Sequence, residues 1–349
     1  MAYKIEDFAM MAPMRYYNNE AASQKRTDMI ENKDDLYVAS EKHDGDWGMF
    51  IHYSKGKNLI RSRSISKLTG VYGDYTAKVP HLCAEMDTWP DNTVVLGELC
   101  FEKYGTNANT VGTILRCLPE KAVERQKSNP LYAYVFDILM YDGQDLTNVG
   151  YWFRLVNWAN RVAVRYNNDE RQPFYFKRTA IFHDGIDFAE AADEIISAGG
   201  EGIVIQRKDN PYMPGTRTAW KTLKLKQSLP EMELKVVAAI DPKMHYEGDC
   251  PDTWEYWYQD MPNANSQAGD FPVTKPFFYG WKNGITVEYN DTTCDVTSGL
   301  TDDDREWLAT DEAQQMIKNG ELYAVVKAMQ TNSLGKLRHP YVVRLRNDM

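Results

Sequence analysis

The pattern of apolar residues changes once along this chain, and the change limits what the chain can fold into. Up to about residue 226, strand-like runs alternate with helical ones. Beyond the segment Gln227-Ser228-Leu229-Pro230, the apolar runs are short and separated by turn residues. The sequence therefore predicts an α+β domain at residues 1–229, which includes an N-terminal helical segment, and an all-β domain at residues 230–349.

Each predicted domain has its own candidate elements. In the first domain, helical candidates lie at residues 111–126, 153–166 and 187–198. The last of these places its apolar residues at a period near 3.6. In the second domain, short strand candidates lie at residues 233–240, 276–289 and 322–329, a helical candidate at 302–318 and a polar loop at 245–271. Multiple short strands with turns indicate a small barrel.

The composition is that of an ordinary globular protein. The 349 residues are 43% hydrophobic and 26% charged, and no apolar run reaches the length of about eighteen residues that a membrane span needs. The N-terminus lacks the apolar core of a signal peptide. The five cysteines are scattered without a Cys-x-x-Cys pair, which argues against a zinc site or a disulfide framework. We therefore expect a monomeric, cytoplasmic protein with no membrane partner.

The net charge of −10 is unexpected for a protein that binds nucleic acid, because Lys and Arg neutralise phosphates. Local fields matter more than the sum, however, and basic residues gather in three segments. They are Arg61, Arg63 and Lys67; Arg207, Lys208, Arg217, Lys221, Lys224 and Lys226; and Arg338, Arg344 and Arg346. These segments are either solvated faces or parts of a phosphate-binding surface.

Lys42 has the setting of a reactive residue. It lies in the sequence Lys42-His43-Asp44-Gly45, just past the strand-like run at residues 36–39. Gly45 permits a tight turn and a close approach of the backbone to a ligand. A lysine amine is a nucleophile only when it is deprotonated, so its neighbours must tune its pKa. Taken alone, the tetrapeptide is more often a polar turn than a catalytic site.

Five further elements follow Lys42 in order. Each has a distinctive polar or aromatic residue in or next to a strand-like run. Their distinctive residues are Arg63, Glu98, Phe136, Glu201 and the pair Lys224 and Lys226. The period of two in residues 220–226 puts both lysines of this pair on one face of a strand. Phe136 is either a core aromatic of its strand or a surface on which a base stacks.

In this order, the six elements resemble the covalent nucleotidyltransferases, and most closely the small phage-type ATP-dependent polynucleotide ligases. Three longer segments resemble ligases as well, at residues 136–146, 201–226 and 337–346. The resemblance implies an ATP-grasp-like nucleotidyltransferase domain, made of antiparallel sheets with helices, followed by an OB-fold domain. It implies an enzyme that seals nicked double-stranded DNA in replication, repair and recombination, in the host cytoplasm if a phage encodes it.

The resemblance also implies a role for each motif residue. Lys42 is the catalytic nucleophile, which takes AMP from ATP before a 5′-phosphate receives the AMP and a 3′-hydroxyl closes the break. The ATP- and AMP-binding residues are Glu41, Lys42, Arg63, Glu98, Phe136, Glu201, Lys224 and Lys226. Glu98 and Glu201 are implied to bind Mg²⁺, for which Mn²⁺ can substitute. The nucleic-acid-binding residues are Arg63, Lys67, Arg217, Lys221, Arg344 and Arg346.

Three positions depart from the ligase pattern. Trp47 stands where DNA ligases usually carry Arg, Gln206 replaces a Lys, and the C-terminal sequence Arg346-Asn347-Asp348-Met349 lacks a final Lys. These departures concern the adenylation step. An RNA ligase, a catalytically weak nucleic-acid clamp and an mRNA capping guanylyltransferase remain as alternatives. The segments at residues 136–146 and 337–346 favour a DNA ligase over all three.

Overall fold

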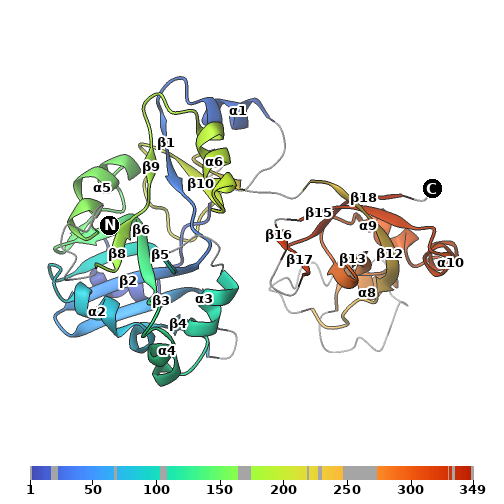
Figure 1. The fold of residues 1–349 in the computed structure, drawn as a ribbon, viewed down its shortest axis with the longest axis horizontal. Coiled ribbons are helices and arrows are strands. Elements are labelled where there is room, and N and C mark those ends of the chain that lie inside the picture. The colour runs from blue at the N-terminus through green and yellow to red at the C-terminus, as the bar shows by residue number, and fades with distance from the viewer. Residues whose placement is uncertain are drawn as a thin grey trace. The chain divides into compact units, whose positions relative to one another are not determined.

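The chain forms two compact units that divide between Lys226 and Gln227 (Figure 1). A computed structural model describes residues 2–16, 23–66, 69–102, 108–163, 174–217, 220–226, 230–246, 273–328, 330–331 and 335–346. Within these residues, both units combine helices with largely antiparallel sheets, so the fold is mixed α/β. No helix in the described ranges is long and apolar enough to cross a membrane.

The larger sheet of the first unit has the strand order β4-β3-β2-β5-β6-β7, and β8 pairs with β6. All of these pairs are antiparallel except β6 with β8. The strands are β2 (Asp46–Ser54), β3 (Lys57–Ile65), β4 (Tyr72–Asp74), β5 (Thr93–Cys100), β6 (Tyr132–Tyr141), β7 (Gln144–Asp145) and β8 (Phe176–Arg178). Their central strands are buried, which explains the nearly continuous apolar run of β5.

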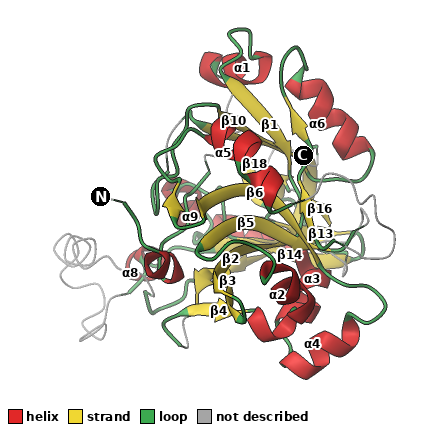
Figure 2. Ribbon diagram, turned by 90° about the vertical axis from the view of Figure 1, so that its left-hand side faces the viewer, coloured by secondary structure: helices red, strands yellow, loops and turns green. Residues whose placement is uncertain are grey.

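A second sheet of this unit has the order β11-β10-β1-β9 and carries the lysine motifs. Its strands are β1 (Tyr37–Glu41), β9 (Ile181–Phe182), β10 (Gly202–Arg207) and β11 (Thr222–Lys226). Alternate residues such as Ala39, Ile205 and Leu223 pack on one face against α6 (Phe188–Ser197) and α1 (Gln24–Glu31), which Figure 2 shows beside this sheet. The opposite face is therefore free to form a site.

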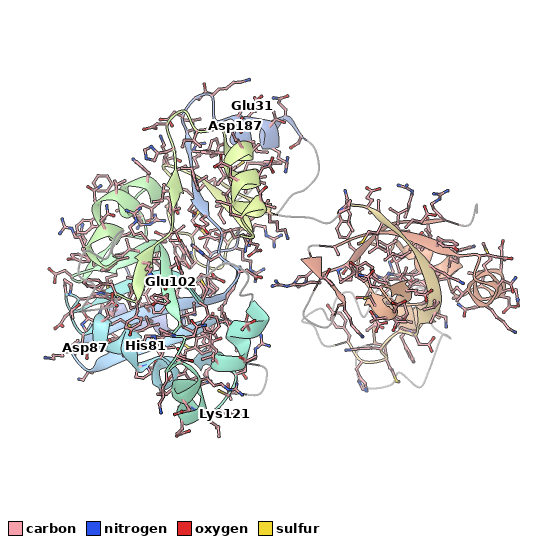
Figure 3. All side chains as sticks on the ribbon, viewed as in Figure 1. Glu31, His81, Asp87, Glu102, Lys121 and Asp187 are labelled. Carbon is pink, nitrogen blue, oxygen red and sulfur yellow. The ribbon has the colours of Figure 1, made fainter. Side chains whose placement is uncertain are left out.

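The remaining helices of the first unit cover the larger sheet and its edges. They are the 3₁₀ turns η1 (Ile5–Ala9), η2 (Thr76–Lys78) and η3 (Ala159–Arg161), and the helices α2 (Pro80–Met86), α3 (Ala108–Leu115), α4 (Pro119–Arg125) and α5 (Tyr151–Asn157). Charged side chains such as Glu31, Glu102 and Lys121 are exposed, and Figure 3 shows Glu31 and Lys121 at opposite edges of the unit. The interior is mostly apolar, and its largest cluster joins β5 and β6 to the helices.

The helical predictions for this unit hold in part. The prediction of a helix at residues 187–198 is confirmed by α6, whose N-cap Asp187 accepts hydrogen bonds from two backbone N–H groups. The prediction of one helix at 111–126 is wrong, because Pro119 starts a new helix, α4, after α3 has ended. The helix predicted at 153–166 begins earlier and is short, since α5 spans Tyr151–Asn157.

The second unit contains a five-stranded antiparallel sheet in the order β14-β13-β12-β15-β18. Its strands are β12 (Met232–Ile240), β13 (Gly284–Tyr289), β14 (Thr292–Val296), β15 (Tyr323–Lys327) and β18 (Tyr341–Arg346). Ser298, just after β14, forms a parallel bridge with Tyr341, and the Val342 N–H donates to the Ser298 carbonyl over 2.8 Å. The two edge strands are thereby linked, and the strands curl around one apolar cluster.

The prediction that the second unit is all-β is wrong, although the helix predicted within it at 302–318 is present, divided in two at residues 308–310. Besides the short pair β16 (Gln330–Thr331) and β17 (Leu337–Arg338), it contains α8 (Lys275–Tyr279), α9 (Asp302–Trp307) and α10 (Asp311–Asn319). Thr274 caps α8 and Pro276 favours its first turn, so the strand predicted at 276–289 begins only at Gly284. The loop predicted at 245–271 lies outside the described residues from 247 onward.

Candidate active site

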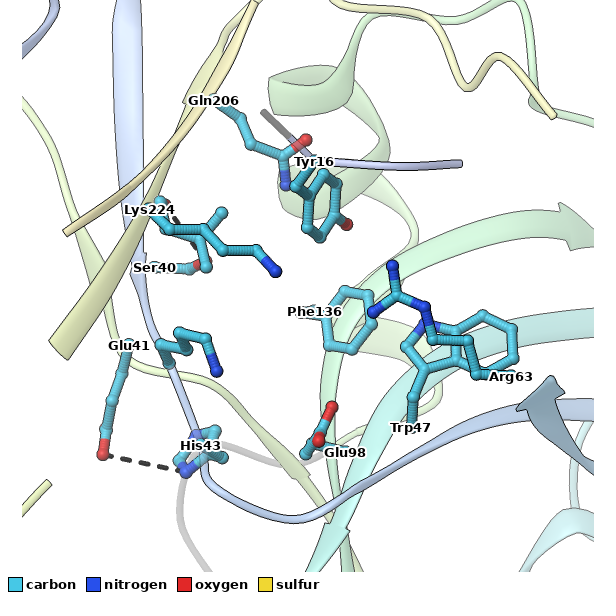
Figure 4. Close-up of a pocket in the computed structure, with 12 residues that line it drawn as sticks. Tyr16, Ser40, Glu41, His43, Trp47, Arg63, Glu98, Phe136, Gln206 and Lys224 are labelled. Atoms are coloured by element: carbon cyan, nitrogen blue, oxygen red, sulfur yellow. Dashed lines mark hydrogen bonds and ion pairs between the residues drawn. The ribbon is translucent and has the colours of Figure 1, made fainter. Parts of the chain in front are cut away.

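Lys42 follows the last residue of β1 and lines a pocket of the first unit, which Figure 4 shows in close-up. Its backbone N–H donates to the Gly202 carbonyl over 2.8 Å, and its Nζ lies 2.5 Å from the Glu201 Oε2. Gly45 is required in the following turn, because a Cβ there would lie 2.2 Å from the Leu99 carbonyl oxygen. The turn thus fixes the lysine at a strand end, with a carboxylate as its partner.

Six of the predicted nucleotide-binding residues line one pocket. They are Glu41, Lys42, Arg63, Glu98, Phe136 and Lys224. Of the other two, Glu201 lies next to the pocket as the ion-pair partner of Lys42. Lys226 ends β11 opposite Gly202, two residues beyond Lys224. Residues far apart in the sequence therefore meet, because β1, β10 and β11 are neighbours in one sheet and residues of β5 and β6 line the same pocket.

Six further residues line this pocket and were not predicted as site residues: Tyr16, Ser40, His43, Trp47, Val204 and Gln206. Val204 and Gln206 could have been found from the sequence, because a period of two places them on one face of β10. Tyr16 carries no such signal, since it comes from the N-terminal segment. Figure 4 shows Tyr16 and Gln206 at the end of the pocket opposite Glu98 and His43.

The predicted nucleic-acid-binding residues are dispersed. Lys67 lies outside the described residues. In the first unit, Arg217 is exposed and Lys221 is half-buried just before β11. In the second unit, Arg344 Nη1 lies 3.8 Å from a Glu231 carboxylate oxygen and Arg346 Nη1 lies 2.7 Å from Glu233. Among the described members of this set, only Arg63 lines the pocket.

Burial dominates the electrostatics of the pocket. It raises the pKa of Glu98 to about 7, against the opposing effect of the Lys42 charge. It lowers the pKa of Lys224 to about 8, and the charges of Lys42 and Arg63 act in the same direction. It also lowers the pKa of His43 to about 3, so this imidazole is neutral at neutral pH. The pocket therefore holds a group of cations at a high electrostatic cost, which an anionic ligand would relieve.

His43 is held beside Lys42 by an aromatic contact. Its ring stacks on Tyr134 with centroids 4.1 Å apart and an interplanar angle of 29°. Its Nδ1 lies 3.7 Å from a Glu41 carboxylate oxygen. Because the imidazole is neutral, this contact orients the ring and is not an ion pair.

Phe136 is fixed by a buried network on its own strand. The next residue, Asp137, accepts two hydrogen bonds from Arg154, over 2.7 and 2.8 Å, and both side chains are fully buried. Tyr151 Oη donates to the Phe136 carbonyl over 3.0 Å. Arg154 also donates to the carbonyls of Val149 and Asn210. Helix α5 thus holds β6 at the point where Phe136 enters the pocket.

Of the two departures from the ligase pattern that lie within the described residues, Gln206 leaves a polar atom unsatisfied in the pocket. It is 1% exposed, and its Oε1 has no hydrogen-bond partner among the described residues. Trp47, the second departure, has a partner within the protein. The Arg61 guanidinium lies 5.6 Å from the centroid of its ring, in a cation–π contact. The third departure, at residues 347–349, lies outside the described part of the chain.

Comparison with known families gives one match over most of the first unit. The family described as the ATP dependent DNA ligase domain matches residues 20–226. This range contains every residue that lines the pocket except Tyr16. The match thus covers the sheet that carries Lys42 and the strands that face it.

Curated relatives carry the same name. The chain is 29% identical over 220 residues to a DNA ligase of Methanocorpusculum labreanum, an alignment that covers 61% of this chain and 36% of the relative. It is 23% identical over 272 residues to a DNA ligase of Pyrobaculum calidifontis, covering 76% of this chain and 40% of the relative. The chain thus spans well under half the length of these two relatives.

Solved structures share the fold at low sequence identity. A structure from a study of Lig E DNA ligases, described as DNA binding with a minimal scaffold, matches with a TM-score of 0.59 and 18% identity. It covers 93% of this chain and 97% of that one. A structure named Pmar-Lig_PreS3 matches with a TM-score of 0.62 and 16% identity, covering 96% and 68%. At these identities the likeness concerns the fold.

Proposed function

This chain belongs to the ATP-dependent DNA ligase family, and from that premise we propose that it seals nicks in double-stranded DNA with ATP as co-substrate. The observation that carries the proposal is the position of Lys42. It lies at a strand end, in a pocket shared with Glu98, Phe136 and Lys224, and is paired with Glu201. A nucleophile, charge for a phosphate and a surface for a base thus meet in one place.

In the first step, the Lys42 amine attacks the α-phosphorus of ATP. An N–P bond forms, the P–O bond to the β-phosphate breaks, and pyrophosphate leaves with the electron pair. Glu201, 2.5 Å from the Nζ, is placed to hold the ammonium form and to receive its proton. The product is a lysyl-AMP adduct.

The other pocket residues supply binding and charge. Lys224 and Arg63 neutralise the α-phosphate, and Lys226 continues this line of charge along β11. Phe136 and Val204 line the pocket from strands of different sheets and are the proposed apolar contacts for the base. Glu41 and Glu98 are polar partners for the nucleoside. Gln206 offers an unsatisfied acceptor to the same ligand.

The carboxylates fit a magnesium ion that arrives with the nucleotide. Mg²⁺ usually binds through one or two carboxylates, substrate phosphates and water. Glu98 and Glu201 give this donor set, and the described residues contain no cluster of three or more acidic, His or Cys side chains that would bind a metal without substrate. When bound, Mg²⁺ neutralises charge on the triphosphate.

In the two later steps, AMP passes from Lys42 to the 5′-phosphate at a nick, and the 3′-hydroxyl attacks that phosphate and releases AMP. We assign the second unit to the OB-fold as a DNA-binding domain. The order β14-β13-β12-β15-β18, with edges linked at Ser298 and Tyr341, supports this assignment. Arg344 and Arg346 of β18, and Arg63, Lys67, Arg217 and Lys221 of the first unit, are the proposed phosphate contacts.

The test is labelling with [α-³²P]ATP, followed by sealing of a nicked DNA duplex. The wild-type protein should form an acid-labile adduct and seal the nick in Mg²⁺ or Mn²⁺, but not in excess chelator. Lys42→Ala should abolish labelling, whereas Lys57→Ala, which changes an exposed lysine, should not. A labelled Lys42→Ala protein would disprove the mechanism. Sealing of single-stranded RNA, but not of nicked DNA, would point to an RNA ligase instead.

A further inference from the structure

The N-terminal segment is built into the first unit. Arg61 Nε donates to the Phe8 carbonyl over 3.1 Å, and Arg61 Nη2 donates to the Met11 carbonyl over 2.5 Å. The Met14 N–H donates to Tyr212 Oη over 3.0 Å. Phe8, Met11 and Met14 are also buried in an apolar cluster with strands of the larger sheet. The segment is therefore fixed along its length up to residue 14.

This anchoring continues to the pocket. The Arg15 N–H donates to the Thr216 carbonyl over 2.9 Å, and Arg15 forms a parallel bridge with Arg217. The next residue, Tyr16, lines the pocket. Its ring lies beside Lys224, whose Nζ is 5.6 Å from the ring centroid (Figure 4). Tyr16 thus reaches the nucleotide pocket from a segment more than 200 residues away from Lys224 in sequence.

The surroundings of Lys224 disfavour its positive charge, so a neighbour that stabilises the charge matters. The charged groups around it are Lys42, Arg63, Lys226 and Glu201, so three of the four are positive. Within the described ranges, no carboxylate oxygen lies within 4.0 Å of its Nζ. Its half-buried position further disfavours the charged form. The face of the Tyr16 ring is a contact that favours an ammonium group without adding a competing anion.

We propose that Tyr16 is a positioning residue, which holds the Lys224 ammonium charged and aimed at the phosphate of the bound nucleotide. The inference rests on the proposed function, because it takes ATP as the ligand. The ring face acts here and the hydroxyl does not, so Phe can replace Tyr. An aliphatic side chain of similar size fills the space but lacks the negative face of the ring.

The experiment measures binding of α,β-methylene-ATP, which Lys42 cannot cleave, to the full-length protein. Tyr16→Phe should keep the wild-type Kd, and Tyr16→Leu should raise it about three- to thirtyfold. Lys224→Met removes the charge but keeps the length of the side chain. If Tyr16 acts through that charge, Tyr16→Leu should change the Kd less than about twofold in the Lys224→Met background. Thermal unfolding without nucleotide identifies any variant that fails to fold.

Each other outcome overturns the inference. If Tyr16→Phe weakens binding as much as Tyr16→Leu, the hydroxyl is the active group. If Tyr16→Leu has the same effect in the Lys224→Met background, Tyr16 acts through pocket shape alone. Wild-type protein that neither binds the analogue nor is labelled by ATP would remove the proposed function, and this inference with it. Wild-type labelling with no effect of Tyr16→Leu would remove only the inference.

Discussion

Among single residues, Gln206 is expected to lower the stability of the fold and to favour the proposed binding of a nucleotide. A buried amide oxygen without a hydrogen-bond partner costs about 1–3 kcal/mol. A site that binds a ligand can retain such a group because the ligand satisfies it. The position on β10, beside Val204 in the pocket, gives Gln206 access to that ligand.

We predict that Gln206→Met stabilises the protein and weakens nucleotide binding. Met has a similar size and no polar group to desolvate, so the free energy of unfolding should rise by about 1 kcal/mol. Adenylate labelling should fall at low ATP concentration. Denaturant unfolding and the ATP dependence of labelling measure the two effects.

Gln126→Met is the matched control for Gln206→Met. Gln126 is also buried, but its side chain donates to the Lys78 carbonyl over 2.7 Å and accepts from the Leu131 N–H. This substitution should therefore destabilise the protein and leave the ATP dependence of labelling unchanged. If both variants lose stability, the Gln206 amide is satisfied in solution and the argument above is wrong.

Much of the candidate site could be predicted at the residue level, and the missing part has a physical reason. Lys42 stands out because it follows an apolar strand-like run, and Glu98 because it interrupts one, whereas Phe136 is itself apolar and is identified only by the ligase motif. Tyr16 does not stand out, because its role depends on where Arg61 and Tyr212 anchor its segment. A contact between residues 16 and 224 leaves no local pattern in either stretch.

Among the elements, the contact between α5 and β6 determines where Phe136 lies. Asp137 and Arg154 form a fully buried pair with two hydrogen bonds, and Tyr151 holds the Phe136 carbonyl from the same helix. Loss of one partner would leave the other charge buried and uncompensated. The position of Phe136, the proposed stacking residue, thus depends on a pair that does not line the pocket.

We predict that Arg154→Met lowers the free energy of unfolding by about 3–5 kcal/mol, because it leaves the buried Asp137 carboxylate without a positive partner. Arg161→Met is the control, because Arg161 is exposed and lies over the Trp158 ring 4.9 Å away. It should cost about 1 kcal/mol or less. Urea unfolding monitored by circular dichroism decides between these values. A loss below about 1 kcal/mol for Arg154→Met would mean that Asp137 is protonated or solvated in the variant.

The sequence patterns identified element types better than element limits. The period of two in residues 220–226 correctly predicts a strand, β11, that brings Lys224 to the pocket. The prediction of a strand at 276–289 is wrong in its first part, because apolar residues such as Phe277 and Phe278 are compatible with a helix as well as with a strand. There the cap Thr274 and Pro276 outweigh the apolar pattern.

For the molecule as a whole, the important feature is that each compact unit has its own apolar interior. The clusters of the first unit draw only on residues before 226, and those of the second unit only on residues after 231. All residues that line the pocket belong to the first unit. We therefore expect truncation to separate the proposed nucleotide binding from the proposed sealing of DNA.

We predict that a fragment of residues 1–226 folds and binds α,β-methylene-ATP within about threefold of the full-length Kd. Sealing of a nicked duplex should fall at least about a hundredfold, because the proposed DNA-binding strands and the Arg344 and Arg346 side chains are absent. Self-labelling by ATP should also fall, to an extent that Arg344→Ala and Arg346→Ala in the full chain reproduce. In the full-length protein, the affinity for DNA should decrease steeply as the salt concentration rises. This is expected if basic side chains contact the DNA phosphates, even though the net charge of the chain is negative. A fragment that seals nicks as well as the full chain would show that the second unit is not needed for DNA binding. A fragment that does not bind the analogue would place part of the nucleotide site beyond residue 226.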